Sequence, residues 1–277
     1  MRHYKLLLLL VFISTLTFGQ KKDKIKGSKI VTTEQIKIVD FESLTVEDNL
    51  EVYLERGERA ELKIEADENL HDIIALDESD NTLRIYTSKQ ATNFKKLIVR
   101  ITYTSDLKSI TSKNETTVTA IQEILLDNFT LKANDASKLF MNINAKNFVL
   151  QSNDKSKTEL NLKSENTTVD LSKNSSLKAL INTTNLKVDM YQKSNAAIEG
   201  EATNAIIRLD NNANLVANKL TLQNADVTTE SYSNCNVNVM TNVIIDAANK
   251  SEIQLVGAPK IEIRKFSDEA KLIKNLK

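Results

Sequence analysis

The chain has 277 residues, and its 37 basic and 37 acidic side chains cancel to a formal net charge of zero. A balanced charge supplies no overall field to draw the protein to nucleic acid or to an anionic membrane. Trp is absent and aromatic residues make up 5% of the chain, which argues against a stacking platform for bases. The length allows one elongated domain or two compact domains.

Residues 1–19 have the order of a secretory signal peptide. A positively charged start precedes an apolar run at 6–18, and the small residues Thr17 and Gly19 stand before a cut at Gln20. The run is shorter than the roughly 20 residues that a spanning helix needs, and no later segment is as apolar. The sequence therefore predicts an exported protein in the periplasm, on the outer surface or outside the cell, with no transmembrane span in the mature chain.

The range 20–112 is predicted to be a β-rich N-terminal module. Short segments alternate apolar and polar residues, as in 50–54 and 83–86, and polar turn signals separate them. Residues 66–76 are predicted to form a short helix that begins at an acidic cap. His71 stands alone in this segment, without a nucleophile motif beside it.

The range 113–261 contains an internal repeat of about nineteen residues. Its clearest marker is a small residue after a polar turn, which recurs in seven copies at Ser137, Ser156, Ser175, Ser194, Ala213, Ser233 and Ser251. Aliphatic positions alternate with polar positions on both sides of this column, which is the period of strands with one buried face. Because one repeat cannot bury its own apolar side, the pattern predicts stacked coils with a continuous core.

Nine residues before that marker, every copy has an asparagine. The seven positions are Asn128, Asn147, Asn166, Asn185, Asn204, Asn224 and Asn242. Asn tolerates positive φ better than other non-glycine residues, so these residues are expected to form a turn in each coil. Their amides are also expected to hydrogen-bond along the stack, which makes them a structural ladder in preference to a ligand face.

These patterns predict an all-β fold. The chain is expected to form a right-handed parallel β-solenoid with about 19 residues per coil, preceded by the β-rich module. Residues 262–277 are predicted to be a C-terminal cap or tail, formed by a short amphipathic helix or a frayed end. Cys235 is the only cysteine and lies in an apolar column, so we expect a buried, reduced thiol.

The order of these elements resembles the bacterial GIN-domain family, described as a "putative auto-transporter adhesin head domain". The resemblance covers residues from about Gly27 to Ile261 and rests on the order of 41–46, 50–54, 66–70 and 83–85, the serial serine turns, and Gly257-Ala258-Pro259. The family typically places Gly beside Ser in its turns, whereas this chain has Asn, Lys and Asp there. The resemblance implies a β-helical, exported protein of Bacteroidetes-like bacteria, and it brings no established activity or site residues.

Residue types with catalytic or cofactor chemistry are sparse. The sequence has no clustered metal ligands and no Gly-rich phosphate loop, so we predict no catalytic, metal or cofactor site. One enzymatic alternative is a carbohydrate-active β-helix, because Asp170 and Asp189 fall in one outward column about 4.8 Å apart. Asp135 and Asp154 pair in the same way on a turn. A solvated polar face explains both pairs equally well, and this alternative ranks third.

The leading functional hypothesis is a non-enzymatic binding or adhesion module at the cell envelope. A rigid rod with regular polar faces would offer outward Lys, Asp and Thr side chains to an unidentified glycan or protein. The second hypothesis is a structural cell-envelope protein without a small ligand, assembling end to end.

Overall fold

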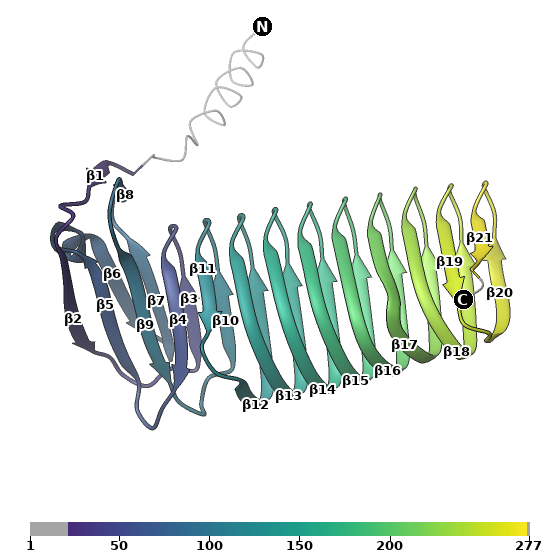
Figure 1. Ribbon diagram of the computed structural model, residues 1–277, viewed down its shortest axis with the longest axis horizontal. Helices are drawn as coiled ribbons and strands as arrows, with labels where there is room; N and C mark the ends of the chain where they lie inside the picture. The colour runs from purple at the N-terminus through teal and green to yellow at the C-terminus, as the bar shows by residue number, and fades with distance from the viewer. Residues whose placement is uncertain (1–21, 276–277) are drawn as a thin grey trace, which may run out of the picture.

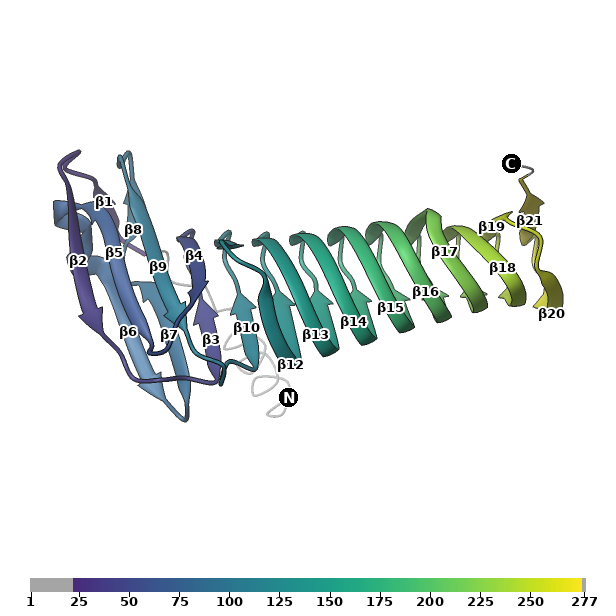
Figure 2. The same cartoon turned by 60° about the horizontal axis from the view of Figure 1, so that its bottom comes forward.

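The computed structural model describes residues 22–275, and almost all of this range is extended. The strands stack side by side along the long axis of a rod, with an irregular group of strands at the N-terminal end (Figure 1). Seen obliquely, β2, β5, β6, β7 and β9 fan out at that end, whereas β20 and β21 form the opposite end (Figure 2).

The N-terminal part holds β1 to β9 and one 3-10 helix, η1. Their bounds are β1 (Lys24–Lys26), β2 (Val31–Lys37), β3 (Ser43–Val46), β4 (Glu51–Arg56), β5 (Glu61–Asp67), η1 (Glu68–Ile73), β6 (Ile74–Ser79), β7 (Thr82–Thr87), β8 (Gln90–Thr92) and β9 (Leu97–Tyr103). β2, β5 and β9 pair antiparallel, as do β6 and β7. The short pair β1–β8 forms a separate sheet.

The rest of the chain is a stack of parallel strands. Their bounds are β10 (Ser109–Ser112), β11 (Thr117–Ala120), β12 (Ile124–Ala133), β13 (Lys138–Ser152), β14 (Lys157–Leu171), β15 (Ser176–Met190), β16 (Asn195–Leu209), β17 (Asn214–Thr229), β18 (Asn234–Ala247), β19 (Glu252–Val256), β20 (Lys260–Phe266) and β21 (Lys271–Lys274). In β13 to β15 each residue pairs with the one nineteen positions later, for example Asn147 with Asn166. The predicted parallel β-solenoid is confirmed.

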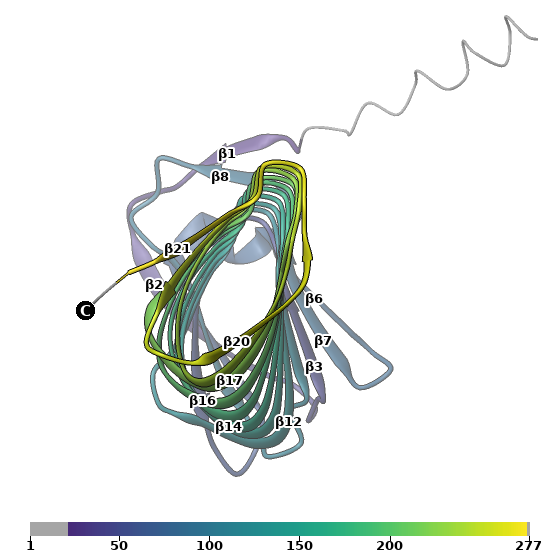
Figure 3. The same cartoon turned by 90° about the vertical axis from the view of Figure 1, so that its right-hand side faces the viewer.

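Each long strand bends around the rod and contributes to two walls, which close an oval cross-section (Figure 3). The first wall contains the segment that follows each tight turn, such as 138–144 in β13. The second wall contains the segment that precedes the next turn, such as 148–152. Alternate side chains of both walls are buried in one continuous core. Cys235 lies in that core, 1% exposed, as its apolar column predicts.

The tight turns use pairs of non-glycine residues with positive φ. Asp154 and Lys155 have φ of 49° and 63°, and the next residue, Ser156, donates its N–H to the carbonyl of Asn153 at 3.1 Å. The Lys155 N–H donates to the carbonyl of Lys173 in the next coil at 3.0 Å, so the turns also stack. Two left-handed residues in succession produce a tight reversal that suits twisted strands.

The expectation that the asparagine column makes the turns is wrong. Within the described residues, none of the seven asparagines has positive φ. They lie inside β12 to β18, where the chain bends between the second wall and the first. This bend is wide enough for extended backbone at the asparagines, whereas the opposite, narrow edge of the oval uses a pair of left-handed residues in each coil.

The serine column follows the tight turns and is fully buried. Ser137, Ser156, Ser175 and Ser194 each have 0% exposure, and Ala213 occupies the same position with 0%. The narrow edge of the oval leaves space only for a small side chain beside the turn. The column therefore has a packing role.

The C-terminal segment differs from the predicted helix or frayed end. β20 and β21 complete another coil, in which Asp268 and Glu269 form the tight turn and Ala270 follows in the serine column. The repeat of nineteen residues thus continues from Ser251 to Ala270, and the hydrogen bonds of the neighbouring coil determine the structure there. Residues 276 and 277 lie outside the described range.

Parallel pairing also begins before the predicted repeat. β3 and β4 pair in parallel with β10 and β11, and β3 also pairs with β7. The predicted helix at 66–76 is a shorter 3-10 helix, η1. Among residues 22–275, no helix is long and apolar enough to cross a membrane. The predicted signal peptide, 1–19, lies outside the described residues.

Candidate groove on the first wall

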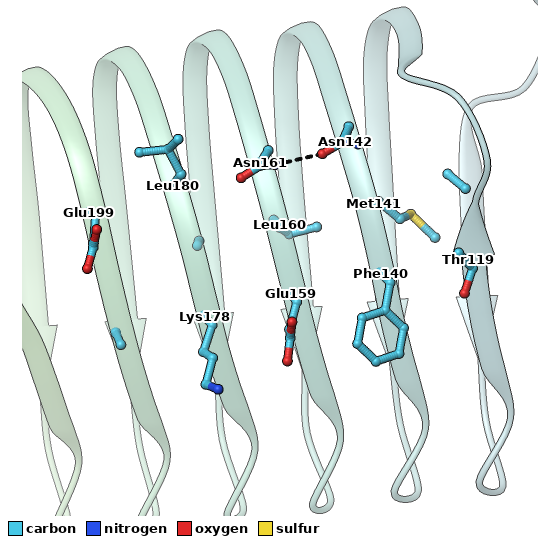
Figure 4. Close-up of a pocket in the computed structure, with 13 residues that line it drawn as sticks. Thr119, Phe140, Met141, Asn142, Glu159, Leu160, Asn161, Lys178, Leu180 and Glu199 are labelled. Carbon is cyan, nitrogen blue, oxygen red and sulfur yellow. Dashed lines mark hydrogen bonds between the residues drawn. The ribbon is translucent and has the colours of Figure 1, made fainter.

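A shallow groove of about 700 Å³ lies on the outer face of the first wall. It crosses the first-wall segments of β11 and β13 to β16, and outward-facing side chains of these strands form much of its lining (Figure 4). Because these strands pair in register, side chains of successive coils form straight columns across the groove. Successive side chains of a column are separated by the strand spacing of about 4.8 Å.

Two columns form most of the lining. The column nearer the tight turns contains Phe140, Glu159, Lys178 and Ala197. The parallel column contains Asn142, Asn161, Leu180 and Glu199. The groove therefore combines an aromatic ring, two amides, charges of both signs and an exposed aliphatic side chain.

Hydrogen bonding fixes part of this surface. The Asn161 Nδ2 donates to the Asn142 Oδ1 at 2.8 Å, as Figure 4 shows. The bond leaves one N–H of Asn161 and the whole amino group of Asn142 available to a ligand. Leu180 follows in the same column with 45% exposure, so an apolar contact lies beside the amides.

The far edge of the groove is marked by an ion pair and a bulge. Glu199 accepts a hydrogen bond from the Lys219 ammonium at 3.0 Å. The pairing of β16 with β17 shifts register between Ala197 and Glu199, which interrupts the regular columns. A long ligand that follows the columns would therefore meet the irregular strand β17 at this edge.

The structure brings all seven predicted asparagines together in one ladder. Each Nδ2 donates to the Oδ1 of the preceding coil, at 2.8 Å from Asn147 to Asn128 and at 2.9 Å from Asn166 to Asn147. The later steps, which end at Asn242, measure 2.9, 3.2, 3.3 and 2.9 Å. Each interior amide donates one hydrogen bond and accepts one within the ladder. The position of the ladder at the bend separates it from the groove columns.

Asp170 and Asp189 lie on the second wall and pair in register. Burial raises the pKa of Asp170, and the neighbouring Asp189 raises it further, while Lys187 opposes the shift. The Lys187 ammonium lies 2.7 Å from the Asp189 carboxylate, and this contact raises the pKa of Lys187. One acid of the pair is thus engaged in an ion pair. Of the other pair, Asp154 lies 3.5 Å from Lys173.

A second charged cluster joins the N-terminal strands to the first coils. The Glu47 carboxylate binds Arg84 at 2.9 Å and Lys113 at 3.2 Å, which ties β3 to its neighbours β7 and β10. Burial raises the pKa of Glu47, but its hydrogen bonds with Arg84 and Lys113 outweigh burial and lower it. The Arg84 guanidinium also lies 4.2 Å from the centre of the Tyr86 ring. The charges of Glu47, Arg84 and Lys113 are paired with one another, which indicates a structural role for this cluster.

His71, the one histidine among the described residues, is held by β2. Its Nε2 lies 3.0 Å from the Thr32 hydroxyl, and its Nδ1 lies 3.2 Å from the Glu34 carboxylate. These contacts attach η1 to the edge strand. Within residues 22–275, no group of three or more His, Cys, Asp or Glu is arranged to hold a metal ion.

The groove residues were not identified from the sequence. Asn142 and Asn161 are separated by nineteen residues, which is the same signal that identified the ladder. Their column changes to Leu180 and Glu199 in the next coils, so it does not stand out as a uniform repeat. Phe140 has no aromatic counterpart in the neighbouring coils.

Comparison with solved structures supports the fold. A putative adhesin from Parabacteroides distasonis is 16% identical, with a TM-score of 0.70 over 91% of this chain and 100% of its own. A putative adhesin from Parabacteroides merdae is 18% identical, with a TM-score of 0.64 over 91% and 99%. A putative lipid binding protein from Parabacteroides distasonis is 16% identical, with a TM-score of 0.63 over 91% and 100%.

Among curated proteins, none matches this sequence significantly. The sequence family described as "Putative auto-transporter adhesin, head GIN domain" matches residues 40–180 and 157–259. These two matches together span most of the solenoid and of the strands that precede it, and they agree with the resemblance seen in the sequence. The chain belongs to this GIN-domain family of adhesin-like proteins.

Proposed function

We propose that the protein is an exported, non-enzymatic binding module whose first-wall groove takes an extended glycan at the cell envelope. The groove carries this proposal, because it is the place where an aromatic ring, free amide groups and charges of both signs meet on a rigid surface. Membership of an adhesin-like family supports a role in binding an external partner. The predicted signal peptide at 1–19 supports export.

The side chains of the groove suit a sugar chain. The Phe140 ring can pack against the apolar face of a pyranose, because an aromatic ring offers a large, flat apolar surface. The amides of Asn142 and Asn161 can donate to and accept from hydroxyl groups, and the carboxylates of Glu159 and Glu199 can accept from them. The columns place one outward side chain of each kind of position at every coil, so an elongated sugar chain that follows them would contact several coils in succession.

A lipid ligand, suggested by the description of one structural neighbour, suits this groove less well. Glu159, Lys178 and Glu199 line the groove and would be desolvated by acyl chains, which is costly for charged groups. A protein partner is the other class that a polar rod face accommodates. The experiment below separates these classes by the probe that binds.

The test starts from the chain without its predicted signal peptide, residues 20–277, on a glycan array. The best-bound glycan is then titrated by calorimetry against the parent protein and Phe140→Ala. We expect about tenfold weaker binding for the variant, equal to about 1.4 kcal/mol. Val149→Ala, a partly exposed position on the second wall, is the matched control and should bind like the parent.

Two results would overturn the proposal. The first is an array on which no glycan binds, together with binding of a protein partner that is insensitive to Phe140→Ala. The second is a glycan whose affinity falls with Val149→Ala and stays unchanged with Phe140→Ala, because this would place the site on the second wall. Turnover of a bound glycan would contradict the non-enzymatic part.

A further inference from the structure

The C-terminal end of the rod has open strand edges on both walls. β20 pairs with β18 and β21 pairs with β19, each on one side only among the described residues. All seven residues of β20 are exposed. Such edges present unpaired backbone N–H and C=O groups, which are templates for another strand.

Apolar side chains that belong to the core columns are exposed at this end. Ile261 and Ile263 pair with Val243 and Ile245, which are 1% and 0% exposed. Ile261 and Ile263 themselves are 41% and 50% exposed, because no further coil covers them among residues 22–275. Phe266 in the same strand is 44% exposed. The final coil thus leaves an apolar surface that the other coils bury.

The N-terminal end of the rod is covered in part by η1, while β2 remains an edge strand that pairs, within the described range, with β5 only. η1 buries Leu70 and Ile73 against the core, at 0% and 3% exposure, and its outward residues Glu68 and Asp72 are acidic. Repeat proteins generally need such a polar cap at each end for solubility. The two ends differ in their exposed side chains: the edge strand β2 exposes mostly polar residues, whereas β20 exposes Ile261, Ile263 and Phe266. The C-terminal end is therefore the one with an apolar surface to cover.

We propose that a second copy of this chain covers the C-terminal end, in a two-fold dimer that pairs β20 with β20 of the other copy antiparallel. The centre of β20, Glu262-Ile263-Arg264, is self-complementary in this antiparallel arrangement. In that register Glu262 of each copy lies opposite Arg264 of the other, and the Ile263 side chains of the two copies lie opposite each other. The dimer contains two cross-strand ion pairs around a central apolar contact.

The geometry of the single chain supports this register. Arg264 is the extra residue at a register shift in the pairing of β20 with β18. Its guanidinium lies 3.2 Å from Glu262 and 3.5 Å from Asp226. Glu262 and Arg264 therefore share the outer face on either side of Ile263, as the cross-strand ion pairs require.

A second copy fits this end better than other occupants. The open edges need a strand, which a lipid surface or a sugar cannot supply. A head-to-tail contact would place Ile261 and Ile263 against the N-terminal end, where β2 exposes Thr, Glu, Gln and Lys side chains and η1 exposes acids. A tail-to-tail dimer buries both apolar ends, leaves both polar caps in solvent and closes after two copies, as isologous interfaces do.

Sedimentation velocity of residues 20–277 across a concentration series is the first test, and it should show a monomer–dimer equilibrium. Ile263→Lys should abolish the dimer, whereas Ile206→Lys, a 57% exposed position on the second wall, should leave it intact. Glu262→Arg alone should weaken dimerisation about tenfold, because two ion pairs become repulsive. The double variant Glu262→Arg/Arg264→Glu should restore it. Circular dichroism checks that each variant is folded.

Cysteine cross-linking tests the two-fold register without relying on a disruptive variant. The single substitution Ile263→Cys places two thiols at the axis and should give a disulfide-linked dimer under mild oxidation, whereas Ile206→Cys should not. Cys235 is buried and should not interfere. A monomer at the highest soluble concentration would overturn the proposal. So would an oligomer that Ile263→Cys does not cross-link, which would indicate a head-to-tail contact or another surface.

Discussion

Asp67 is fully buried, yet its carboxylate is held in the charged form by the backbone. It accepts hydrogen bonds from the N–H groups of Lys29 at 2.8 Å, Lys95 at 3.0 Å and Lys96 at 3.0 Å. Burial raises the pKa of Asp67, but these three donors outweigh burial and lower the pKa. One side chain thereby fastens the segment before β2 to the loop between β8 and β9.

Replacing Asp67 with Asn should lower the free energy of unfolding by about 3 kcal/mol at neutral pH, because charged hydrogen bonds to buried donors are lost. The folded pKa is depressed, so the stabilisation is present above the ordinary value of about 3.9 and is lost as the pH falls through the folded pKa. Urea unfolding of both proteins at several pH values measures the difference. Asp72→Asn, an exposed acid in η1, is the control, and an equal loss there would contradict the assignment.

Asp170 should behave in the opposite way. Its raised pKa means that the folded protein retains a proton which the unfolded chain releases near pH 3.9. Stability therefore falls as the pH rises from that value through the folded pKa. Asp170→Asn should raise the free energy of unfolding at pH 7 by up to about 1 kcal/mol, with no gain near pH 3. Thermal unfolding at both pH values measures this, and a neutral-pH loss would contradict it.

At the scale of the elements, each coil is made from a tight turn, two wall segments and the bend that carries the ladder. The backbone pairs of β13 to β16 supply the regular hydrogen bonds, and the ladder adds one side-chain bond per coil at the bend. Asn185 is central, because it donates to Asn166 at 2.9 Å and accepts from Asn204 at 3.2 Å. Its loss would interrupt the ladder on both sides.

Asn185→Ala should reduce the free energy of unfolding by about 1–2 kcal/mol, since each net hydrogen bond contributes about 1 kcal/mol or less at an exposed position. The matched control is Asn182→Ala in the same strand, whose side chain points outward without a place in the ladder. Guanidinium unfolding measures both variants. Equal stability of Asn185→Ala and the parent would show that the ladder contributes nothing measurable.

The solenoid could be predicted from the sequence because residues of similar type occupy the equivalent position in every coil. The serine and aliphatic columns therefore predicted the core and the coil length. The same reasoning misassigned the turns: it gave positive φ to Asn147 and its equivalents, whereas residues such as Lys155 and Lys193 adopt it. Asn has the better local preference, but the hydrogen bonds of neighbouring coils impose the left-handed geometry on whichever residue occupies the narrow edge.

The C-terminal segment shows the same limit. Its mixture of charged and apolar residues was interpreted as a helix or frayed end, yet β20 and β21 extend the walls. An existing edge strand supplies hydrogen bonds to the next segment at low cost in ordering, so the neighbouring coil outweighs weak local propensity. Sequence inspection could have detected this continuation at Ala270, nineteen residues after Ser251.

At the scale of the whole molecule, the interior of the rod is a regular packed core, whereas its exterior varies in residue type from coil to coil. The oval cross-section limits the size and polarity of the side chains in the core columns. Similar residues therefore recur in every coil, and the repeat can be recognised in the sequence. The groove residues Phe140, Asn161 and Leu180 face solvent, and the fold accepts many residue types at such positions. For this reason the sequence predicted the scaffold of the binding surface and did not locate the groove on it.

The proposed dimer would give the C-terminal end of the rod a role of its own. The acidic cap at η1 keeps one end in solvent, and the proposed dimer would bury the other. Two copies joined tail to tail would present two grooves on one longer rod. Such an arrangement strengthens binding to a polymeric ligand through effective concentration, without any new contact.

The most direct test of the central claim is a crystal structure of residues 20–277 with the tightest glycan from the array. The groove predicts ligand density along the first wall, with a sugar ring against Phe140 and hydroxyl groups bonded to Asn142 or Asn161. Ligand density confined to the second wall, or to the asparagine ladder at the bend, would contradict the claim.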